Sequence, residues 1–277
     1  MKKMFNLKGI LNVSIISMLL FGCSKDGGSS STAATGNNNG SGNNNSGSNT
    51  AVSKKGMGLN EKNGFNNTQL QLLNISWYYN WDLTTAANST ISFVPMEWGT
   101  GGLSSLTNYT YLMGFNEPDN ASQSNLTVTQ ALGYWPTLVG ATTNIGSPAM
   151  AGNPVNSGSW LQQFMQSSPK VDFITVHWYK GVDTTTFYND MTNIYNLFKK
   201  PIWITEFAPQ TAAQSSANPT QYSQAQVNQF IVSVTNWMNS QSFVQRYAWH
   251  DSQAGTSAIF TTAGQLTATG LTYAAVK

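Results

Sequence analysis

The sequence is short of the residue types on which several classes of functional site depend. Its 277 residues include one cysteine, two histidines and one arginine. A single cysteine excludes a disulfide framework and a cysteine-ligated metal site, and two histidines are too few for an ordinary zinc site. The formal charge of +2 without a large basic cluster disfavours nucleic-acid binding. We therefore expect no metal, no cofactor and no nucleic-acid partner.

Charged side chains are also scarce, whereas aromatic side chains are abundant. Charged residues make up 9% of the chain and aromatic residues 12%, including nine tryptophans. Indole rings stack on the CH faces of sugars, and side-chain amides and hydroxyls bond to sugar hydroxyl groups. The composition therefore favours a neutral, hydroxyl-rich ligand.

The first 23 residues have the form of a targeting segment. A basic start precedes an apolar stretch over residues 10–21, and residues 20–23, Leu-Phe-Gly-Cys, resemble a bacterial lipobox. An ordinary secretory signal or a short membrane anchor is the alternative. We expect Cys23 to carry a lipid that anchors an extracytoplasmic bacterial lipoprotein to a membrane, at the outer membrane or the cell surface.

The rest of the chain divides into a linker and one domain. Residues 24–53 are mostly Gly, Asn, Ser and Thr, and such a stretch cannot bury enough apolar surface to offset its ordering entropy. We expect a flexible linker there. Residues 54–277 have the length of a single domain, which we expect to be catalytic and monomeric.

Apolar, strand-like runs alternate with helix-compatible stretches in this domain. Several runs are continuously apolar, which is typical of parallel strands covered on both faces. The runs span residues 74–79, 91–96, 111–115, 137–142, 171–179, 201–207 and 244–250. The stretches with helical periodicity span residues 127–134, 160–166, 187–198 and 221–238.

This alternation predicts an α/β fold, a compact (β/α)8 TIM-type barrel. Seven runs are one fewer than the eight strands of such a barrel. Only 14 residues separate Met96 from Tyr111, which is too few for a strand flanked by two helices. We therefore expect an abbreviated third βα unit.

Two of the four glutamates, Glu117 and Glu206, lie at the ends of such runs. The carboxyl ends of parallel strands share one rim of a barrel, and two facing carboxyl groups can cleave a glycosidic bond. The neighbouring Asn116 could hold a sugar 2-hydroxyl. Alternatively, Asn-Glu-Pro could begin a helix, and Glu206 could form a structural ion pair, for which Arg246 is the only arginine.

Other side chains near the strand ends are candidates for substrate binding. Tyr179 could donate a hydrogen bond to Glu206, His177 could orient the acid or the substrate, and Trp249 could form the floor under the sugar. For His177 and the tryptophans, packing in the core is the alternative. The remaining candidates are Trp77, Tyr79, Trp81, Asp82, Glu97 and Trp98.

Seven ordered motifs carry a resemblance to glycoside hydrolase family 128, whose endo-β-1,3-glucanases belong to the clan A of retaining (β/α)8 enzymes. The resemblance covers residues 54 to about 253. The motifs are Lys54-Lys55-Gly56, Trp77-Tyr78-Tyr79-Asn80-Trp81, Phe93-Val94-Pro95-Met96, Gly114-Phe115-Asn116-Glu117-Pro118-Asp119, Ser147-Pro148-Ala149, Val176-His177-Trp178-Tyr179 and Lys200-Pro201-Ile202-Trp203-Ile204-Thr205-Glu206-Phe207-Ala208.

The resemblance implies that Glu117 is the acid/base at the end of the fourth strand and Glu206 the nucleophile at the end of the seventh. It also implies a retaining endo-hydrolase that cleaves β-1,3-glucan of the laminarin or curdlan type by double displacement. Two alternatives remain at this point. One is a retaining hydrolase of another β-glucan, and the other is a non-catalytic, surface glycan-binding lipoprotein.

Overall fold

Eight short strands follow one another along the described part of the computed structural model, which comprises residues 53–209, 222–250 and 255–277. Six of them form a sheet in the order β3-β2-β1-β8-β7-β6, and β4 pairs with β5. All of these pairs are parallel. The strands are β1 (Lys55–Gly58), β2 (Trp77–Tyr79), β3 (Ser92–Phe93), β4 (Tyr109–Leu112), β5 (Thr142–Ile145), β6 (Ile174–Trp178), β7 (Ile202–Phe207) and β8 (Val244–His250).

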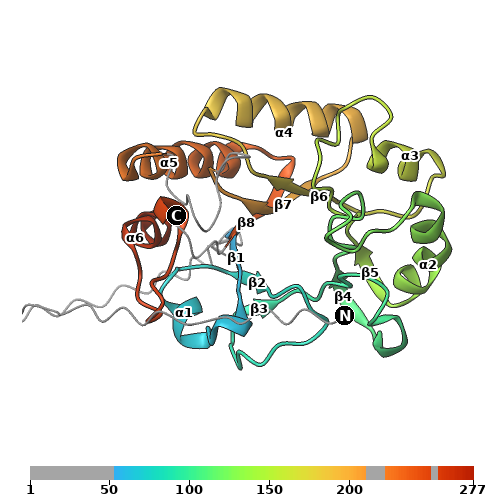
Figure 1. Ribbon diagram of the computed structural model, residues 1–277, viewed down its shortest axis with the longest axis horizontal. Helices are drawn as coiled ribbons and strands as arrows, with labels where there is room; N and C mark the ends of the chain where they lie inside the picture. The colour runs from blue at the N-terminus through green and yellow to red at the C-terminus, as the bar shows by residue number, and fades with distance from the viewer. Residues whose placement is uncertain (1–52, 210–221, 251–254) are drawn as a thin grey trace, which may run out of the picture. The chain divides into compact units, whose positions relative to one another are not determined.

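Two isolated parallel bridges join the six-stranded and two-stranded sheets. Met96, just after β3, bridges to Met113 after β4, and Gly146 after β5 bridges to Phe173 before β6. Because β1 also pairs with β8, the strands form a ring (Figure 1). The predicted TIM-type barrel is therefore confirmed.

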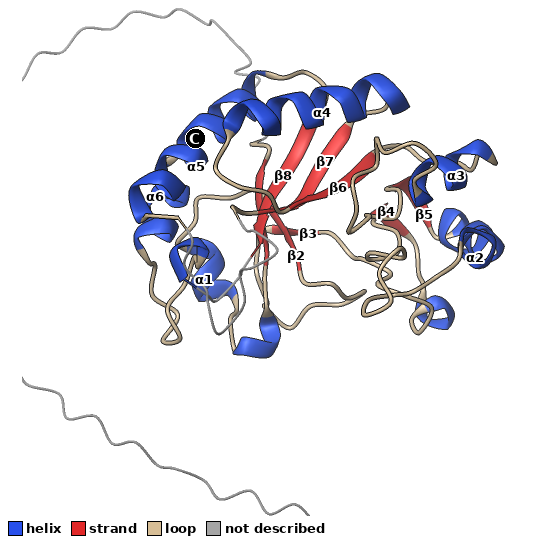
Figure 2. Ribbon diagram, turned by 45° about the horizontal axis from the view of Figure 1, so that its top comes forward, coloured by secondary structure: helices blue, strands red, loops and turns tan. Residues whose placement is uncertain are grey.

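Six α-helices among the described residues lie on the outside of this ring (Figure 2). Side-chain caps define several of their starts. Thr127 and Gln130 form a capping box at the start of α2, and Ser223 and Gln226 form another at the start of α5. The helices are α1 (Asn67–Gln71), α2 (Val128–Gly140), α3 (Trp160–Gln166), α4 (Thr184–Phe198), α5 (Gln224–Ser240) and α6 (Ala268–Ala275).

The third βα unit is abbreviated, as the short interval before Tyr111 predicts. Strand β3 has two residues, and only the 3₁₀ turn η2 (Leu103–Ser105) separates it from β4. The 3₁₀ turns η1 (Glu61–Asn63) and η3 (Gly255–Ser257) lie in other loops. Glu117 therefore follows the fourth strand, although its run is only the third in the sequence-based count.

The strand predicted over residues 137–142 is wrong, because most of this stretch is the last turn of α2 and strand β5 begins at Thr142. Strand β1 was not predicted, since its sequence is Lys-Gly-Met-Gly. Lys55 is nevertheless fully buried, because its ammonium group donates to the carbonyl oxygens of Tyr273, Ala274 and Val276 at the end of α6. This contact replaces the apolar burial that a strand usually shows.

Aromatic side chains fill the inside of the barrel. A cluster separate from the outer core contains Trp77, Tyr79, Val94, Met96, Met113, Phe173, Trp203 and Ala248. The guanidinium of Arg246 lies 4.3 Å from the ring centre of Trp203 and 5.3 Å from that of Trp77. The interior is therefore packed, and ligands have access only at the rim.

The predicted lipoprotein signal, residues 1–23 with Cys23, and nearly all of the linker over residues 24–53 lie outside the described residues. The first strand of the barrel, β1, begins at Lys55, one residue after the predicted start of the domain at residue 54. None of the helices that the structure describes combines the length and apolar character needed to cross a bilayer.

Candidate active site

Glu117 and Glu206 reach the same rim of the barrel from two different strands. Glu206 lies within β7, one residue before its end, and is 5% exposed. Glu117 follows β4 in a left-handed backbone conformation, with φ of 44°, and its amide donates to the carbonyl oxygen of Ala149 at 2.7 Å. A non-glycine residue in this region is strained, and such strain is common at active sites.

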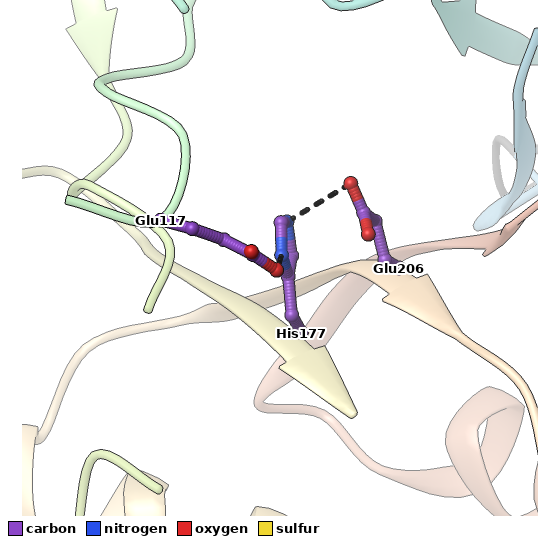
Figure 3. A group of neighbouring side chains, drawn as sticks. All are labelled: Glu117, His177 and Glu206. Carbon is purple, nitrogen blue, oxygen red and sulfur yellow. Dashed lines mark hydrogen bonds and ion pairs between the residues drawn. The ribbon is translucent and has the colours of Figure 1, made fainter. Parts of the chain in front are cut away.

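His177, from β6, lies between the two carboxylates (Figure 3). Its Nδ1 is 2.9 Å from Oε1 of Glu117. Its Nε2 is 3.4 Å from Oε1 of Glu206, an ion-pair contact that lacks hydrogen-bond geometry. One donor atom from each of the three residues lies within 4.8 Å of the other two. The register between β6 and β7 shifts next to His177, which aligns it with Glu206.

The separation of the carboxylates indicates a stereochemical outcome. Retaining glycosidases hold their two carboxyl groups about 5–5.5 Å apart, whereas inverting enzymes leave about 6.5–9.5 Å for a water molecule. The nearest carboxylate oxygens of Glu117 and Glu206 fall within 4.8 Å of each other. The arrangement therefore fits the shorter separation of retaining enzymes, in which one carboxylate attacks the sugar directly.

Besides His177, three side chains place donor atoms around the carboxylate of Glu206. Oε1 accepts from Nε1 of Trp81 at 2.7 Å and lies 3.3 Å from Oη of Tyr79, which also lies 3.0 Å from the carbonyl oxygen of Thr205. Oε2 accepts from Oη of Tyr179. Burial and the charge of Glu206 hold the pKa of both tyrosines well above 10, so each stays a donor.

This environment favours the ionised form of Glu206. Burial by itself raises the pKa of the carboxyl group, but His177, His250 and the hydrogen bonds from Tyr179 and Trp81 outweigh burial and lower it below 4.5. For His177, burial lowers the pKa, whereas Glu206 and Glu117 raise it, and the net pKa lies above 6.5. The site thus pairs an ionised carboxylate with an imidazole that readily takes up a proton.

A groove of about 880 Å³ opens beside the carboxylates. It is bordered by residues that follow β1, β2, β3 and β4, together with Glu206 and His250 from β7 and β8. Several buried polar atoms at the groove have no hydrogen-bond partner. They include Oε2 of Glu97, Oδ1 of Asn116 and Nδ1 of His250. These atoms give the groove polar groups that can hydrogen-bond a ligand or water.

Comparisons with known proteins agree with this geometry. A family model described as the glycosyl hydrolase catalytic core matches residues 56–273. The chain is similar to an endo-β-1,3-glucanase of family 128 from Amycolatopsis mediterranei, solved with laminaritriose, at 31% identity and a TM-score of 0.70. The alignment covers 80% of this chain and 98% of that enzyme. The chain belongs to glycoside hydrolase family 128.

Two further relatives extend the comparison. A family 128 oligosaccharide-binding protein from Trichoderma gamsii is 25% identical, with a TM-score of 0.66, over 80% of this chain and 92% of that one. Alkali-sensitive linkage protein 1 of Schizosaccharomyces pombe is 32% identical over 190 residues, which is 63% of this chain. The matched stretch spans only 34% of that protein.

Both structural alternatives for the glutamates of this family 128 site are excluded by the structure. Asn116-Glu117-Pro118 begins a turn, in which the amide of Asn120 donates to the carbonyl oxygen of Glu117, and the next helix begins only at Val128. Arg246 lies inside the barrel against aromatic rings and makes no ion pair with Glu206. Both carboxylates are therefore available for chemistry.

Two predicted sugar-binding tryptophans are part of the core instead. Trp249 is fully buried, packs against Phe207 and Tyr273, and donates to the carbonyl oxygen of Ser257. Strand alternation explains this placement, because Ala248 faces the barrel interior and Trp249 therefore faces the helices. Trp77 is buried inside the barrel, where it donates to the carbonyl oxygen of Lys54.

Tyr79 and Tyr179 touch Glu206, and His177 touches both glutamates, so these three support the carboxylates directly. Tyr79 was predicted to bind substrate, but its ring is fully buried. Asn116, Glu97 and Trp98 border the groove, and Trp98 is 39% exposed. Their binding of substrate stays a prediction. Asp82 also borders it.

Two roles were not predicted from the sequence. Trp81 was expected to line the groove, and its hydrogen bond to Glu206 was not foreseen. His250 ends β8 with its ring edge-on to Trp81 and Tyr179, and burial lowers its pKa. Strand alternation could have placed His250 on the opposite side of β8 from Trp249. Trp81 lies beyond the end of β2, so alternation does not predict its bond to Glu206.

Glu117, His177 and Glu206 also form a group that could hold a metal ion, with one donor atom each. Two carboxylates and one imidazole match the composition of some catalytic zinc sites. However, Glu206 already accepts from Trp81 and Tyr179, and Glu117 is paired with His177. We therefore assign the group to acid-base and nucleophilic chemistry.

Proposed function

We propose that this chain is a retaining endo-β-1,3-glucanase in which Glu117 is the acid/base and Glu206 the nucleophile. The observation that carries the proposal is the placement of two carboxylates, one after β4 and one in β7, with oxygens within 4.8 Å of each other around one histidine. Glu206 accepts from Trp81 on Oε1 and from Tyr179 on Oε2, which suits an ionised nucleophile. Glu117 contacts His177 at Oε1 and accepts from the side-chain amide of Asn120 at Oε2. Glu117 has the more exposed side chain of the two, 12% against 7%.

In the first step, Glu206 attacks the anomeric carbon while Glu117 transfers its proton to the departing glycosidic oxygen. The carbon–oxygen bond to the leaving chain breaks as the glycosyl–Glu206 ester forms. His177 holds Glu117 through Nδ1 and faces Glu206 through Nε2, so it can keep both groups oriented as charge moves between them.

In the second step, Glu117 removes a proton from water, and the resulting hydroxide attacks the same carbon from the opposite face. Glu206 leaves as a carboxylate, and Trp81 and Tyr179 remain placed to receive its charge. Two inversions give net retention of the anomeric configuration. No cofactor or metal is required for either step.

The preference for β-1,3-glucan is supported by the similar Amycolatopsis mediterranei endo-β-1,3-glucanase and its laminaritriose complex. Hydrolysis of another β-glucan is the first alternative. The second is binding without hydrolysis, which has support from the Trichoderma gamsii relative. The intact carboxylate pair favours an enzyme, because binding alone does not require a nucleophile held ionised by two donors.

We further propose that the enzyme acts as a monomer tethered by a lipid on Cys23, outside the cytoplasm of a bacterium. The support is the lipobox-like sequence at residues 20–23 and the Gly/Asn/Ser composition of residues 24–53. Metabolic labelling with a tagged fatty acid tests the anchor. Labelling should appear in the full chain and disappear in Cys23→Ala.

Hydrolysis of laminarin, curdlan, lichenan and pustulan, with chain-length analysis of the products, tests the activity. We expect laminarin and curdlan to yield a ladder of intermediate oligosaccharides, since an endo-hydrolase cuts internal bonds. Proton NMR should detect the β-anomer as the first product. Wild-type hydrolysis rates in Glu206→Gln would overturn the assignment, and tight oligosaccharide binding without turnover would favour the binding protein.

A further inference from the structure

Trp81 occupies an unusual position for a groove residue, because its polar atom points at the nucleophile. Its Nε1 donates to Oε1 of Glu206 at 2.7 Å, shorter than the 3.3 Å contact of Tyr79 with the same oxygen. Trp81 follows β2 by two residues, so Tyr79 and Trp81 approach Glu206 from one strand end. Their ring centres are 4.9 Å apart.

The backbone and a neighbouring strand are shaped to hold this indole. Trp81 adopts a φ of 63°, a left-handed conformation that a bulky residue rarely takes. Gly58 at the end of β1 leaves the space for it, because a Cβ there would lie 3.0 Å from Cη2 of Trp81. His250 packs its ring edge-on to the indole. Strain of this kind persists only where surrounding contacts over-determine it.

We propose that Trp81 is a positioning residue that holds the nucleophile Glu206 ionised and oriented through its indole N–H. This inference rests on the proposed function, in which Glu206 attacks the sugar. An indole N–H is a donor only. If Oε1 were protonated on the side that faces Trp81, its proton would point at the indole hydrogen and the two would repel. The bond therefore favours the carboxylate over the carboxylic acid.

Trp81 differs from the other groups that face Glu206, because the indole itself does not titrate. Those groups come from every element packed around the carboxylate: Tyr79 from β2, Glu117 after β4, His177 and Tyr179 from the end of β6, and His250 from β8. The charges of His177 and His250 change with pH. The contribution of Trp81 is independent of pH, so it favours the ionised form of Glu206 to the same extent across the whole titration.

The test measures the protonation of Glu206 directly. The chain has only four glutamates, so labelling with [5-¹³C]glutamate gives four carboxyl resonances, and Glu206→Gln identifies the one of interest. In Trp81→Phe, we expect the midpoint of the Glu206 titration to rise by about one pH unit, as expected for a lost hydrogen bond to a charged group. The same midpoint in wild type and Trp81→Phe would overturn the inference.

The pH dependence of kcat/KM provides a second readout, because a shifted Glu206 titration and a general structural defect change it in different ways. The acidic limb of kcat/KM should move up with the midpoint, giving about a tenfold loss one unit below the wild-type midpoint and little loss on the plateau. A uniform loss at every pH, with the limb unmoved, would mean that Trp81 only maintains the groove. Gly58→Ala, which crowds the indole, should shift the limb in the same direction by less.

Trp98→Phe is the matched control. Trp98 borders the same groove but is 39% exposed and donates to neither catalytic carboxylate in the described structure. It should alter KM and leave the Glu206 midpoint unchanged. If Trp81→Phe does not fold, Trp81→benzothienylalanine keeps the bicyclic ring without the N–H, and an unmoved midpoint there overturns the inference. The NMR readout needs no activity, so failure of the proposed function is seen separately.

Discussion

The Nδ1 atom of His177 lies 2.9 Å from Oε1 of Glu117, and this contact ties the acid/base to the strand next to the nucleophile. The side chain of His177 is only 1% exposed. A buried imidazole between two carboxylates gains much from its positive charge, provided that the carboxylates stay ionised. The site therefore couples the charges of Glu117 and Glu206 through one ring.

His177 should stabilise the fold in a pH-dependent manner. Burial alone lowers its pKa, but Glu206 and Glu117 raise it above 6.5 in the folded protein. Folding therefore favours the protonated form, and this stabilisation is complete below about pH 6.5 and lost as the pH rises through the folded pKa. We expect His177→Gln to reduce the free energy of unfolding more at about pH 6 than at about pH 9.

Urea unfolding of both proteins at the two pH values checks this prediction. His250→Gln serves as a control of opposite sign. Burial holds the pKa of His250 below 6.5, so protonation of His250 opposes folding and the wild type should lose its advantage over this variant as the pH falls. Equal effects of His177→Gln at both pH values would contradict a raised pKa.

Glu117→Gln should show the leaving-group dependence of a lost general acid. We expect kcat/KM on laminarin to fall about 10²–10⁴-fold, and the loss to shrink on an aryl β-glucoside whose leaving group needs no proton. Initial rates on both substrates check this. Glu61→Gln is the matched control, because Glu61 borders the same groove but is bound to Thr85 and Ala86. Equal losses on both substrates would argue against an acid/base role.

Much of the barrel could be predicted because its strands are continuously apolar and its helices are periodic. Helix α3 has the predicted bounds, Trp160–Gln166, and Glu206 lies at the end of the apolar run that forms β7. Two strands lack this signal. Strand β5 is Thr-Thr-Asn-Ile, and β1 contains Lys55, whose burial depends on carbonyl groups more than 200 residues away in the chain.

The sequence did not predict which side of a strand each side chain of the site would face. In β8, successive side chains face opposite sides: Ala248 faces the barrel interior, Trp249 faces α6, and His250 borders the groove. Nothing in the residues themselves marks Trp249 as a core side chain. The bond from Trp81 to Glu206 depends on a left-handed turn after β2, which no residue preference predicts, because tryptophan rarely takes that conformation.

Lys55→Met should destabilise the fold more than Lys54→Met. Both ammonium groups donate to three carbonyl oxygens at a helix end, Lys55 at α6 and Lys54 at α5. Lys55 is fully buried, so its loss leaves carbonyl groups unsatisfied, at about 1–3 kcal/mol for each buried group left unpaired. Lys54 is partly exposed, and water can replace it. Chemical denaturation of the two variants compares them, and equal losses would contradict this account.

Trp98 and Trp249 can be used to separate effects on substrate binding from effects on stability. Trp98 is 39% exposed at the groove, whereas Trp249 is fully buried and donates to the carbonyl oxygen of Ser257 at 3.0 Å. Trp98→Ala should raise KM for laminarin by about threefold to tenfold, as expected for one lost stacking contact, and change the free energy of unfolding by less than about 0.5 kcal/mol.

Trp249→Phe should do the reverse. The smaller ring leaves space against Phe207 and Tyr273 and removes the donor to Ser257, so we expect a loss of about 1–3 kcal/mol in the free energy of unfolding. KM should stay near the wild-type value, because Trp249 does not border the groove. Denaturant unfolding and steady-state kinetics on both variants check the pair. A raised KM with unchanged stability in Trp249→Phe would return this residue to the sugar-binding surface, where sequence reasoning first put it.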